Sequence, residues 1–522
     1  MLLNDQGSVS SVPGQTAAKA KVLAQFSRLF TSASQVASIL MRVVGDNFGA
    51  DIDELEAHRY DAADVATNLD QSNFSSFRLL TQNCWSLPVA PLCNERLKAL
   101  CKQIFAGGSD GYDCVCLQEV WHVNERRVAI DAARQGGLLY YHYFEQGVGM
   151  PIHRGQNGTG MMVLSRWPIV FSQYHRFTVS GRLHRFLEAD YVGGKGFGLC
   201  RLRTPAGMID VVTTHLVSNY ARAHTSEFDR YYAIRVQQAF ELGRFLSEFS
   251  DRSHASLMCV AGDLNMHKSD LVVRAVESFG GVKDVWDKGE DTGITFGAAQ
   301  NCWSRHEGPQ RLDYLFFKST NRQRWQVAPN SAKVVECMVE TPLAAHFTNT
   351  AGATSVPVSD HAGLEVRFEL AGSPSEKQEG YHCEEGVADT AAAPCLDLDM
   401  LREAQSLFRG QVQVSKKEFD SYSRQGLLAF VTWVCLISLV AFEIVGAGLL
   451  VALAVCFLPA FGMGNWLISH FTVAEELGAV KDMVRTIDHL LRGAQIAAYL
   501  EKSSQFLPGA SVAKRVPLCE GD

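Results

Sequence analysis

The chain has 522 residues, a formal net charge of −8 and a pI near 6.1. This balance lacks the basic excess of proteins that bind nucleic-acid backbones, so no nucleic-acid partner is expected. The 14 cysteines include no CxxC pair, which disfavours a structural zinc site and favours reduced thiols. The length accommodates one large domain with accessory segments.

Residues 1–70 have the character of an N-terminal helical accessory segment. Apolar residues recur at helical spacing within 22–30 and within 36–43, and the charges around them are basic. Three roles fit this pattern: a helix at a membrane surface, an organelle-targeting peptide, or a helix packed on the main domain. The sequence leaves the three open.

Residues 76–370 alternate short apolar runs with helical patterns. The helical patterns cover 94–105 and 231–249. This mixture predicts an α/β fold in which sheets form the centre and helices cover the outer faces. The strand-like runs are residues 78–81, 114–117, 161–164, 197–202, 209–213, 257–261 and 314–317.

Polar side chains follow several of these runs at the point where the strand is expected to end. A residue at the end of a strand stands at the rim of a sheet, where side chains from different strands can form one site. Carboxylates, histidines and carboxamides gathered in this way suit metal-assisted cleavage of a phosphoester. The residues are Asn83, Glu119, His215, Asp263, Asn265, Asp360 and His361.

Glu119 and Asn83 are the candidate metal ligands. Glu119 follows a strand-like run and offers a carboxylate to a hard divalent cation, and Asn83 offers a neutral oxygen, directly or through water. A few oxygen ligands combined with retained waters suit Mg²⁺. Each residue alone also fits a simpler role, since strand-end glutamates often form surface ion pairs and asparagines often occupy turns.

His215 and His361 are the candidate acid–base pair, because one histidine can abstract a proton while another stabilises phosphoryl charge. Asp263 and Asn265 point the same way if their strand continues, and Asp263 can then orient the attacking water. The Gly-Asp-Leu-Asn sequence is equally compatible with a turn closed by an Asx hydrogen bond. Asp360 reaches the site beside His361 only on a loop, since neighbouring side chains of a strand diverge.

Beyond this domain the composition predicts a linker and a membrane anchor. Residues 371–395 are small, charged and proline-containing, as in a flexible linker, and residues 396–425 follow as a juxtamembrane helix. Between residues 426 and 468 the only charged side chain is Glu443, which allows two transmembrane helices of about 20 residues each. A buried helical hairpin of a soluble protein is the alternative. Residues 474–502 form an amphipathic helix, lying on the membrane surface or against the catalytic domain.

An even number of spans places both flanks on one side of the membrane. Lys416, Lys417 and Arg424 precede the spans, and Lys481 and Arg485 follow them. The positive-inside tendency therefore predicts an integral, multi-pass protein whose catalytic domain faces the cytosol. The sequence does not choose the organelle, and the endoplasmic reticulum is one internal membrane that fits.

The polar motifs resemble those of a known family. Residues 76–370 are similar to the endonuclease/exonuclease/phosphatase superfamily, and within it to the membrane-bound, magnesium-dependent neutral sphingomyelinases. The paired C-terminal spans resemble the mammalian-type branch of that group. The resemblance is carried by Gln82-Asn83-Cys84-Trp85, Leu117-Gln118-Glu119-Val120-Trp121, Gly160-Met161-Met162-Val163-Leu164-Ser165-Arg166, Thr214-His215-Leu216, Gly262-Asp263-Leu264-Asn265, Arg311-Leu312-Asp313-Tyr314 and Ser359-Asp360-His361.

The resemblance implies a DNase I-like four-layer sandwich, in which two packed β-sheets are flanked by helices, followed by a C-terminal transmembrane helical hairpin. It also implies the metal site and the base. Glu119 binds Mg²⁺ and Asn83 assists there. His361 is the general base, and Asp360 orients it or lies near the metal.

The same resemblance implies roles for the remaining site residues. Asp263 positions the attacking water and Asn265 contacts the phosphate. His215 stabilises the pentacoordinate transition state. Lys195 approaches the lipid phosphate, or Asp190 and Lys195 rearrange to gate the site, and a glycine-rich hairpin is the simpler reading of this segment.

The implied activity is that of a phospholipase C-type phosphodiesterase, which converts sphingomyelin or a related phosphosphingolipid to ceramide and a phosphorylated head group. The implied partners are the lipid bilayer and its phosphosphingolipid, with anionic phospholipids as a further candidate. A phosphoinositide phosphatase or a nuclease on the same scaffold is the alternative. The head group stays open among phosphocholine, phosphoethanolamine and phosphoinositol.

Overall fold

The structure is a computed structural model, and the statements below concern the residues that it describes. The expected N-terminal segment (1–70) and residues 372–395 of the expected linker lie outside them. The described residues are 74–87, 90–108, 111–121, 123–145, 158–188, 190–220, 229–286, 293–319, 325–371, 397–441 and 448–506.

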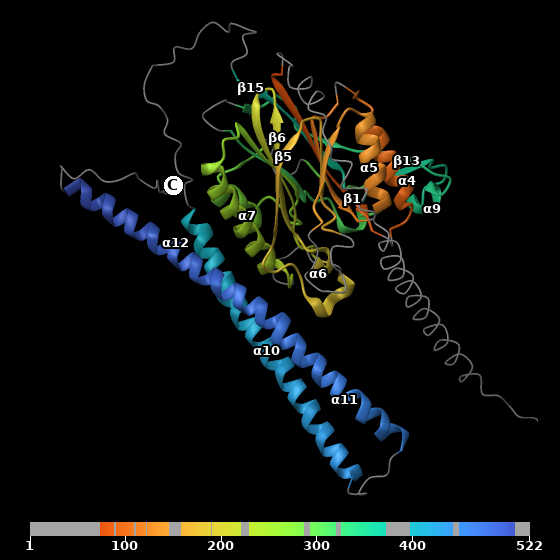
Figure 1. The fold of residues 1–522 in the computed structure, drawn as a ribbon, viewed down its shortest axis with the longest axis vertical. Coiled ribbons are helices and arrows are strands. Elements are labelled where there is room, and N and C mark those ends of the chain that lie inside the picture. Colours follow the sequence, from red (N-terminus) through yellow and green to blue (C-terminus); the bar gives the residue numbers. More distant parts are fainter. Residues whose placement is uncertain are drawn as a thin grey trace, which may run out of the picture.

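Two mixed β-sheets pack face to face in the centre of the molecule (Figure 1). The first has the strand order β11 (Trp325–Val327), β15 (Gly363–Leu370), β1 (Ser76–Ser86), β2 (Cys114–Val120), β4 (Met162–Ser165) and β3 (Tyr140–Tyr143), with β12 (Lys333–Val335) paired to β15. The second has the order β5 (Ile169–Arg176), β6 (Gly196–Thr204), β7 (Gly207–His215), β8 (Leu257–Asp263), β10 (Asp313–Ser319) and β9 (Lys283–Asp284). A separate pair consists of β13 (Met338–Glu340) and β14 (Ser355–Pro357).

Helices cover the outer faces of both sheets, which confirms the expected four-layer sandwich. Apolar side chains of α4 (Cys93–Ile104) and α5 (Val123–Gln135) pack on the first sheet. Those of α7 (Tyr232–Arg252) and α8 (Leu271–Gly280) pack on the second. The short helices are η2 (Leu183–Glu188), α6 (Asp190–Gly193), η3 (Arg305–Glu307) and α9 (Ala344–Thr348).

Strand β8 shows why its sequence is apolar without alternation. Cys259 and Ala261 face the layer between the sheets, whereas Met258 and Val260 face α7 and α8. A strand that is buried on both faces needs apolar side chains at every position. The run ends at Asp263, where the strand reaches the edge of the sandwich.

The C-terminal part of the chain forms a long helical hairpin beside the sandwich (Figure 1). Gly426 and Gly462 allow the two arms to approach closely, since a Cβ on Gly426 would lie 3.1 Å from the Gly462 carbonyl oxygen. Two helices are long and apolar enough to cross a membrane. Residues 442–447, which connect them, lie outside the described residues. The elements are α10 (Leu398–Ala441), α11 (Leu449–Leu467), the π-helix η4 (Ile468–Val473) and α12 (Ala474–Phe506).

Candidate active site

Four central strands bring polar residues to one edge of the sandwich. Strands β1 and β2 run parallel, with Asn83 aligned to Gln118 and therefore next to Glu119. Strands β7 and β8 also run parallel, with His215 aligned to Asp263. The Asn83 amide nitrogen donates a hydrogen bond of 3.1 Å to the Asp263 carboxylate, which joins the two sheets at this edge.

Gly262 permits the close approach of β7 and β8 beside the site. Its φ is 151°, and a Cβ at this position would lie 1.9 Å from the carbonyl oxygen of Thr214. Any side chain would therefore force the two strands apart. The glycine of the Gly-Asp-Leu-Asn motif is required by packing, and Asp263 follows it.

A cavity of about 500 Å³ opens at this edge. It brings together six of the eight site residues expected from the sequence, and the other two contact them. Asn83 bonds Asp263, and His215 bonds Lys195, from buried positions just behind the cavity wall. The six lining residues are Glu119, Lys195, Asp263, Asn265, Asp360 and His361.

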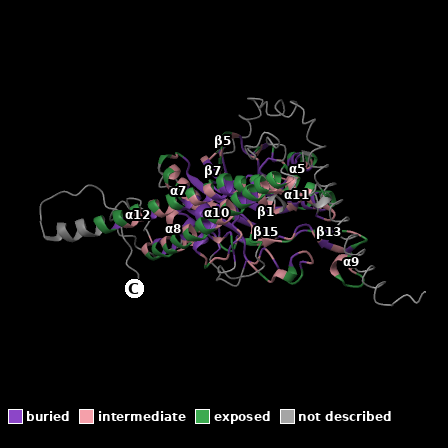
Figure 2. Ribbon diagram, turned by 90° about the horizontal axis from the view of Figure 1, so that it is seen from below, coloured by how far each residue is buried: buried purple, intermediate pink, exposed green. Residues whose placement is uncertain are grey.

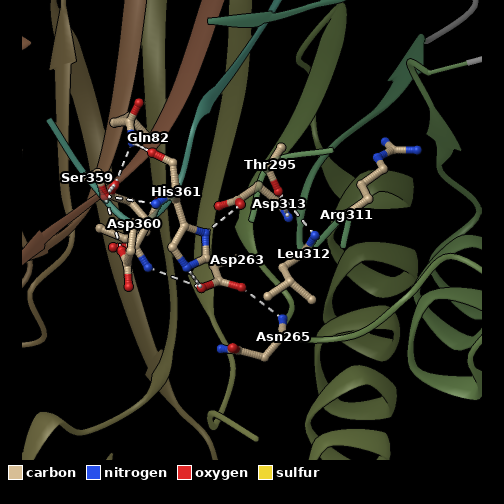
Figure 3. Close-up of polar contacts among 12 residues, drawn as sticks. Gln82, Asp263, Asn265, Thr295, Arg311, Leu312, Asp313, Ser359, Asp360 and His361 are labelled. Atoms are coloured by element: carbon tan, nitrogen blue, oxygen red, sulfur yellow. Dashed lines mark hydrogen bonds and ion pairs between the residues drawn. The ribbon is translucent and has the colours of Figure 1, made fainter. Parts of the chain in front are cut away.

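His361 is held by the carboxylate of Asp313 (Figure 3). Its Nδ1 lies 2.8 Å from Asp313 Oδ2, and its Nε2 lies 3.8 Å from Asp263 Oδ2. Burial opposes protonation of the ring, but the charges of Asp313 and Asp263 outweigh it and raise the pKa of His361 well above its ordinary value. Nδ1 is thereby fixed against a carboxylate, and Nε2 is directed toward Asp263.

Asp313 is the functional residue whose role the sequence did not reveal. It begins β10 and is aligned with Asp263 in the antiparallel pair of β10 and β8. The backbone N–H groups of Leu312 and Asp313 donate to Thr295 Oγ1, which fixes the start of the strand. The Arg-Leu-Asp-Tyr motif marked this position, but only the strand register connects it to His361.

Asp360 was expected to orient His361 or to lie near the metal, and the structure places the carboxylate of Asp313 against the imidazole Nδ1. The Asp360 side chain accepts a hydrogen bond from Ser359, and its carbonyl oxygen accepts bonds from Asn301 and Ser304. The carboxyl group lines the cavity, and burial raises its pKa to about 6. Adjacent side chains diverge, so Asp360 points elsewhere while His361 meets Asp313.

His215 and Lys195 form a buried pair behind the cavity. His215 Nε2 lies 2.7 Å from Lys195 Nζ, and Lys195 also lies 3.1 Å from Asp190 Oδ1. Burial and the Lys195 charge lower the pKa of His215 well below its ordinary value, so the neutral ring accepts a hydrogen bond from the ammonium group. Asp190 begins the short helix α6, so this segment is not the hairpin weighed from the sequence.

The Glu119 carboxylate has the properties expected of a metal ligand. Its φ of 61° is in the left-handed region, a strained conformation that is typical of functional positions. Burial raises its pKa, and Oε2 has no hydrogen-bond partner among the described residues. A buried carboxylate oxygen without a donor is costly, and a cation in the adjoining cavity relieves that cost.

Asn83 contacts both carboxylates of the candidate metal site. Its amide nitrogen faces Glu119 at 3.4 Å and Asp263 at 3.1 Å, and its carbonyl oxygen accepts the backbone N–H of Trp85. The Asn83 amide group thus orients the two carboxylates, and the second lone pair of its oxygen stays available to a cation or to a water molecule.

A second group of possible cation ligands lies beside the first. Asp263, Asp313 and His361 each contribute one atom within 4.8 Å of the others. Burial and the neighbouring Asp313 raise the pKa of Asp263 to about 6. Since His361 and Asp313 already satisfy each other, Glu119 is the better candidate for metal binding.

Asn265 occupies a turn, which was the second of its two sequence readings. Strand β8 ends at Asp263, Asn265 has a φ of 53°, and its backbone N–H donates to Asp263 Oδ1 at 2.8 Å. Its side-chain nitrogen donates to the Leu216 carbonyl oxygen at 3.0 Å. This Asx turn places Asn265 on the cavity wall without a continued strand.

Comparisons with known proteins place this site in a family. The family described as Endonuclease/Exonuclease/phosphatase matches residues 80–361. A putative neutral sphingomyelinase of Drosophila melanogaster is 30% identical over 257 residues, covering 48% of this chain and 54% of that protein. Sphingomyelin phosphodiesterase 2 of Rattus norvegicus is 30% identical over 265 residues, covering 48% and 58%. Inositol phosphosphingolipids phospholipase C of Schizosaccharomyces pombe is 30% identical over 332 residues, covering 58% and 70%.

The matches to the fly and rat proteins span little more than half of those proteins. The family match covers more than half of this chain and contains every site residue expected from the sequence. By this match, the chain belongs to the Endonuclease/Exonuclease/phosphatase family.

Proposed function

We propose that the chain is a membrane-anchored, Mg²⁺-dependent phosphodiesterase of the phospholipase C type, which cleaves a phosphosphingolipid into ceramide and a phosphorylated head group. The observation that carries this proposal is the His361–Asp313 pair facing Glu119 and Lys195 in one cavity. The names of the relatives, which include sphingomyelin and inositol phosphosphingolipid hydrolases, support the substrate class.

His361 acts as the general base. In its neutral form, Nε2 accepts a proton from a water molecule that Asp263 orients, since the two side chains lie 3.8 Å apart. The water oxygen bonds to phosphorus, and the bond between phosphorus and the ceramide oxygen breaks. Asp313 stabilises the imidazolium that results.

Lys195 and Asn265 stabilise the phosphoryl oxygens from the cavity wall, and His215 contributes by holding Lys195. Lys195 supplies a fixed positive charge, which His215 and Asp190 hold in place. Such preorganised groups act more strongly in a water-excluded cavity than in solution. Glu119 would hold a Mg²⁺ ion, which would supply charge neutralisation to the phosphoryl group and to the departing alkoxide.

The apolar helices α10 and α11 anchor the chain in a bilayer with both flanks in the cytosol. Large apolar side chains on these helices are exposed, including Leu428 at 68% and Phe457 at 65%. Such a surface is unfavourable in water and favourable in lipid. Basic residues on both flanks support the orientation.

The charges around the cavity disfavour the two alternative functions. Among the described residues that line the cavity, Lys195 is the only lysine or arginine, whereas eight are carboxylates. Nucleic acids and polyphosphorylated inositides are polyanions, which need several cationic contacts. The acidic lining residues are Glu119, Glu188, Asp190, Asp229, Asp263, Asp270, Glu307 and Asp360.

Mass spectrometry of reaction products tests the function. Purified protein is incubated with sphingolipids that carry phosphocholine, phosphoethanolamine or phosphoinositol, with Mg²⁺ or with EDTA. We expect ceramide and an intact phosphorylated head group, formed only with Mg²⁺. Release of inorganic phosphate, or an undiminished rate in EDTA, would contradict the proposal.

A further inference from the structure

A buried ion pair joins the sandwich to the C-terminal hairpin. Arg182, between β5 and η2, donates from Nε to Glu476 Oε2 at 2.9 Å and from Nη2 to Glu476 Oε1 at 3.0 Å. It also donates to Glu418 of α10 at 3.3 Å. The side chains of Arg182 and Glu476 are only 5% and 2% exposed.

The hairpin supplies further donors to the same carboxylate. Ser415 and Gln411 of α10 each donate to Glu476 Oε1 at 3.0 Å. A buried charge is tolerated only when its partners are present in good geometry, and a bidentate guanidinium pair has one favoured orientation. The cluster therefore specifies one docking position between the sandwich and the hairpin.

Apolar packing accompanies the ion pair. We call residues 398–425 of α10 and residues 474–496 of α12 the stem. Phe408 of α10 and Val480 and Ile487 of α12 are fully buried in one cluster with α7, α8 and the second sheet. Within the stem, α12 packs against α10 and contacts the sandwich at Glu476 and Ala479. Because α10 packs against α7 and α8, the buried residues of the stem are continuous with the core of the sandwich (Figure 2).

The ion pair lies close to the apolar stretch of the hairpin. Glu418 stands eight positions before Gly426, where the apolar stretch begins, and Glu476 stands eight positions after Ile468, where it ends. At 1.5 Å per residue, each distance is about 12 Å along a helix. Arg182 is therefore held just outside the region that the lipid head groups occupy.

The segment that begins at Arg182 continues directly into the wall of the cavity. Glu188, Asp190 and Lys195 follow it in the sequence and line the cavity. In Figure 1, α6 is the part of the sandwich that extends furthest toward the apolar end of the hairpin. Arg182, which binds the hairpin, and these residues of the cavity wall thus belong to one short segment.

We propose that Arg182 is a positioning residue, which fixes the cavity at the height of the head groups so that substrate comes from the bilayer holding the hairpin. This inference rests on the proposed hydrolase function and on insertion of α10 and α11 in the membrane. Arg182 does not line the cavity and takes no part in the chemistry.

The test uses the full-length chain reconstituted in vesicles. Three substrates are compared: a labelled sphingolipid in the same vesicle, the same lipid in separate protein-free vesicles, and a water-soluble chromogenic phosphodiester with the same head group. The wild type is expected to hydrolyse lipid of its own vesicle far faster than lipid of separate vesicles. Arg182→Gln is expected to lower the own-vesicle rate about tenfold or more, because positioning sets the effective concentration. Its rate on the soluble substrate should stay near the wild-type value.

Two further variants separate positioning from folding. Arg274→Gln removes an exposed ion pair with Glu403 between α8 and α10, and it should behave as the wild type. The charge exchange Arg182→Glu with Glu476→Arg should restore a large part of the own-vesicle rate.

Three results would overturn the inference. One is an unchanged own-vesicle rate in Arg182→Gln, and another is an equal loss on all three substrates that the charge exchange does not repair. The third is a wild type that hydrolyses separate vesicles as fast as its own. A wild type without activity on any of the substrates would instead refute the proposed function, and the inference with it.

Discussion

The sandwich and the apolar end of the hairpin differ in the burial of their large apolar side chains. In the sandwich, Leu79 and Leu199 are fully buried between or beside the sheets. In the hairpin, Leu428 is 68% exposed and Phe457 is 65% exposed, although both stand in well-formed helices. The same residue types therefore drive folding against each other in one region and suit contact with lipid in the other.

The stem between these regions shares the character of the sandwich. Its apolar residues join the core that covers the second sheet, and its charges pair with Arg182. Chemistry, stability and membrane attachment should thus depend on different residues. Each prediction below changes one of these properties and measures whether the others stay constant.

The largest expected effect is on the chemistry of the sandwich. In the proposed site Glu119 holds the cation, so we expect removal of its charge in Glu119→Gln to lower kcat by about 100- to 1,000-fold. The variant should still fractionate with membranes, as should the control Glu248→Gln, which changes an exposed glutamate. Steady-state kinetics and membrane fractionation measure the two properties. Normal turnover of Glu119→Gln would remove Glu119 from the metal site.

The second effect is on stability. Leu79→Ala leaves a cavity between the sheets and should lower the free energy of unfolding by about 2–5 kcal/mol. The matched change Leu428→Ala alters an exposed side chain and should lower it by much less in detergent. Denaturant unfolding of both proteins in detergent gives the comparison. Equal losses would show that Leu428 packs against protein.

The third effect is on the pH dependence. Asp313 raises the pKa of His361, and His361, the proposed base, is neutral only above that pKa. Asp313→Asn should therefore move the acid limb of the kcat profile to lower pH and reduce the plateau by roughly tenfold to a hundredfold. Rates measured across pH in Mg²⁺ give both values. A shift of the acid limb to higher pH would contradict the pairing.

The smallest effect is expected from removal of the membrane spans. Deletion of residues 426–468 should release the protein from membranes while its rate on detergent-dispersed lipid stays within about twofold, since both flanks pack on the sandwich. Fractionation and a detergent assay test this. A protein that loses its chemistry in detergent would show that the spans do more than anchor it.

The sequence predicted the site well where a residue ends a strand. Asn83, Glu119, His215 and Asp263 follow apolar runs, and parallel pairing brings such ends together. The sequence did not assign Asp313, because its contact with His361 depends on the antiparallel register of β8 and β10.

Long-range side-chain pairing and local turns are the other features that could not be predicted from the sequence. Arg182 and Glu476 lie 294 positions apart, and neither belongs to a sequence motif that would predict their contact. The sequence around Asn265 was compatible with a continued strand and with a turn. In the structure β8 ends at Asp263 and Asn265 occupies the turn. For Asp360 the sequence left two roles open, because the pattern does not show whether Asp360 and His361 stand on a strand, where their side chains diverge, or on a loop.

The most direct test of the central claim is hydrolysis in water enriched in ¹⁸O, with mass spectrometry of both products. If His361 activates a water molecule that attacks phosphorus, one ¹⁸O atom enters the phosphorylated head group and the ceramide stays unlabelled. Label in the ceramide, or labelled inorganic phosphate in place of the head group, would contradict the account.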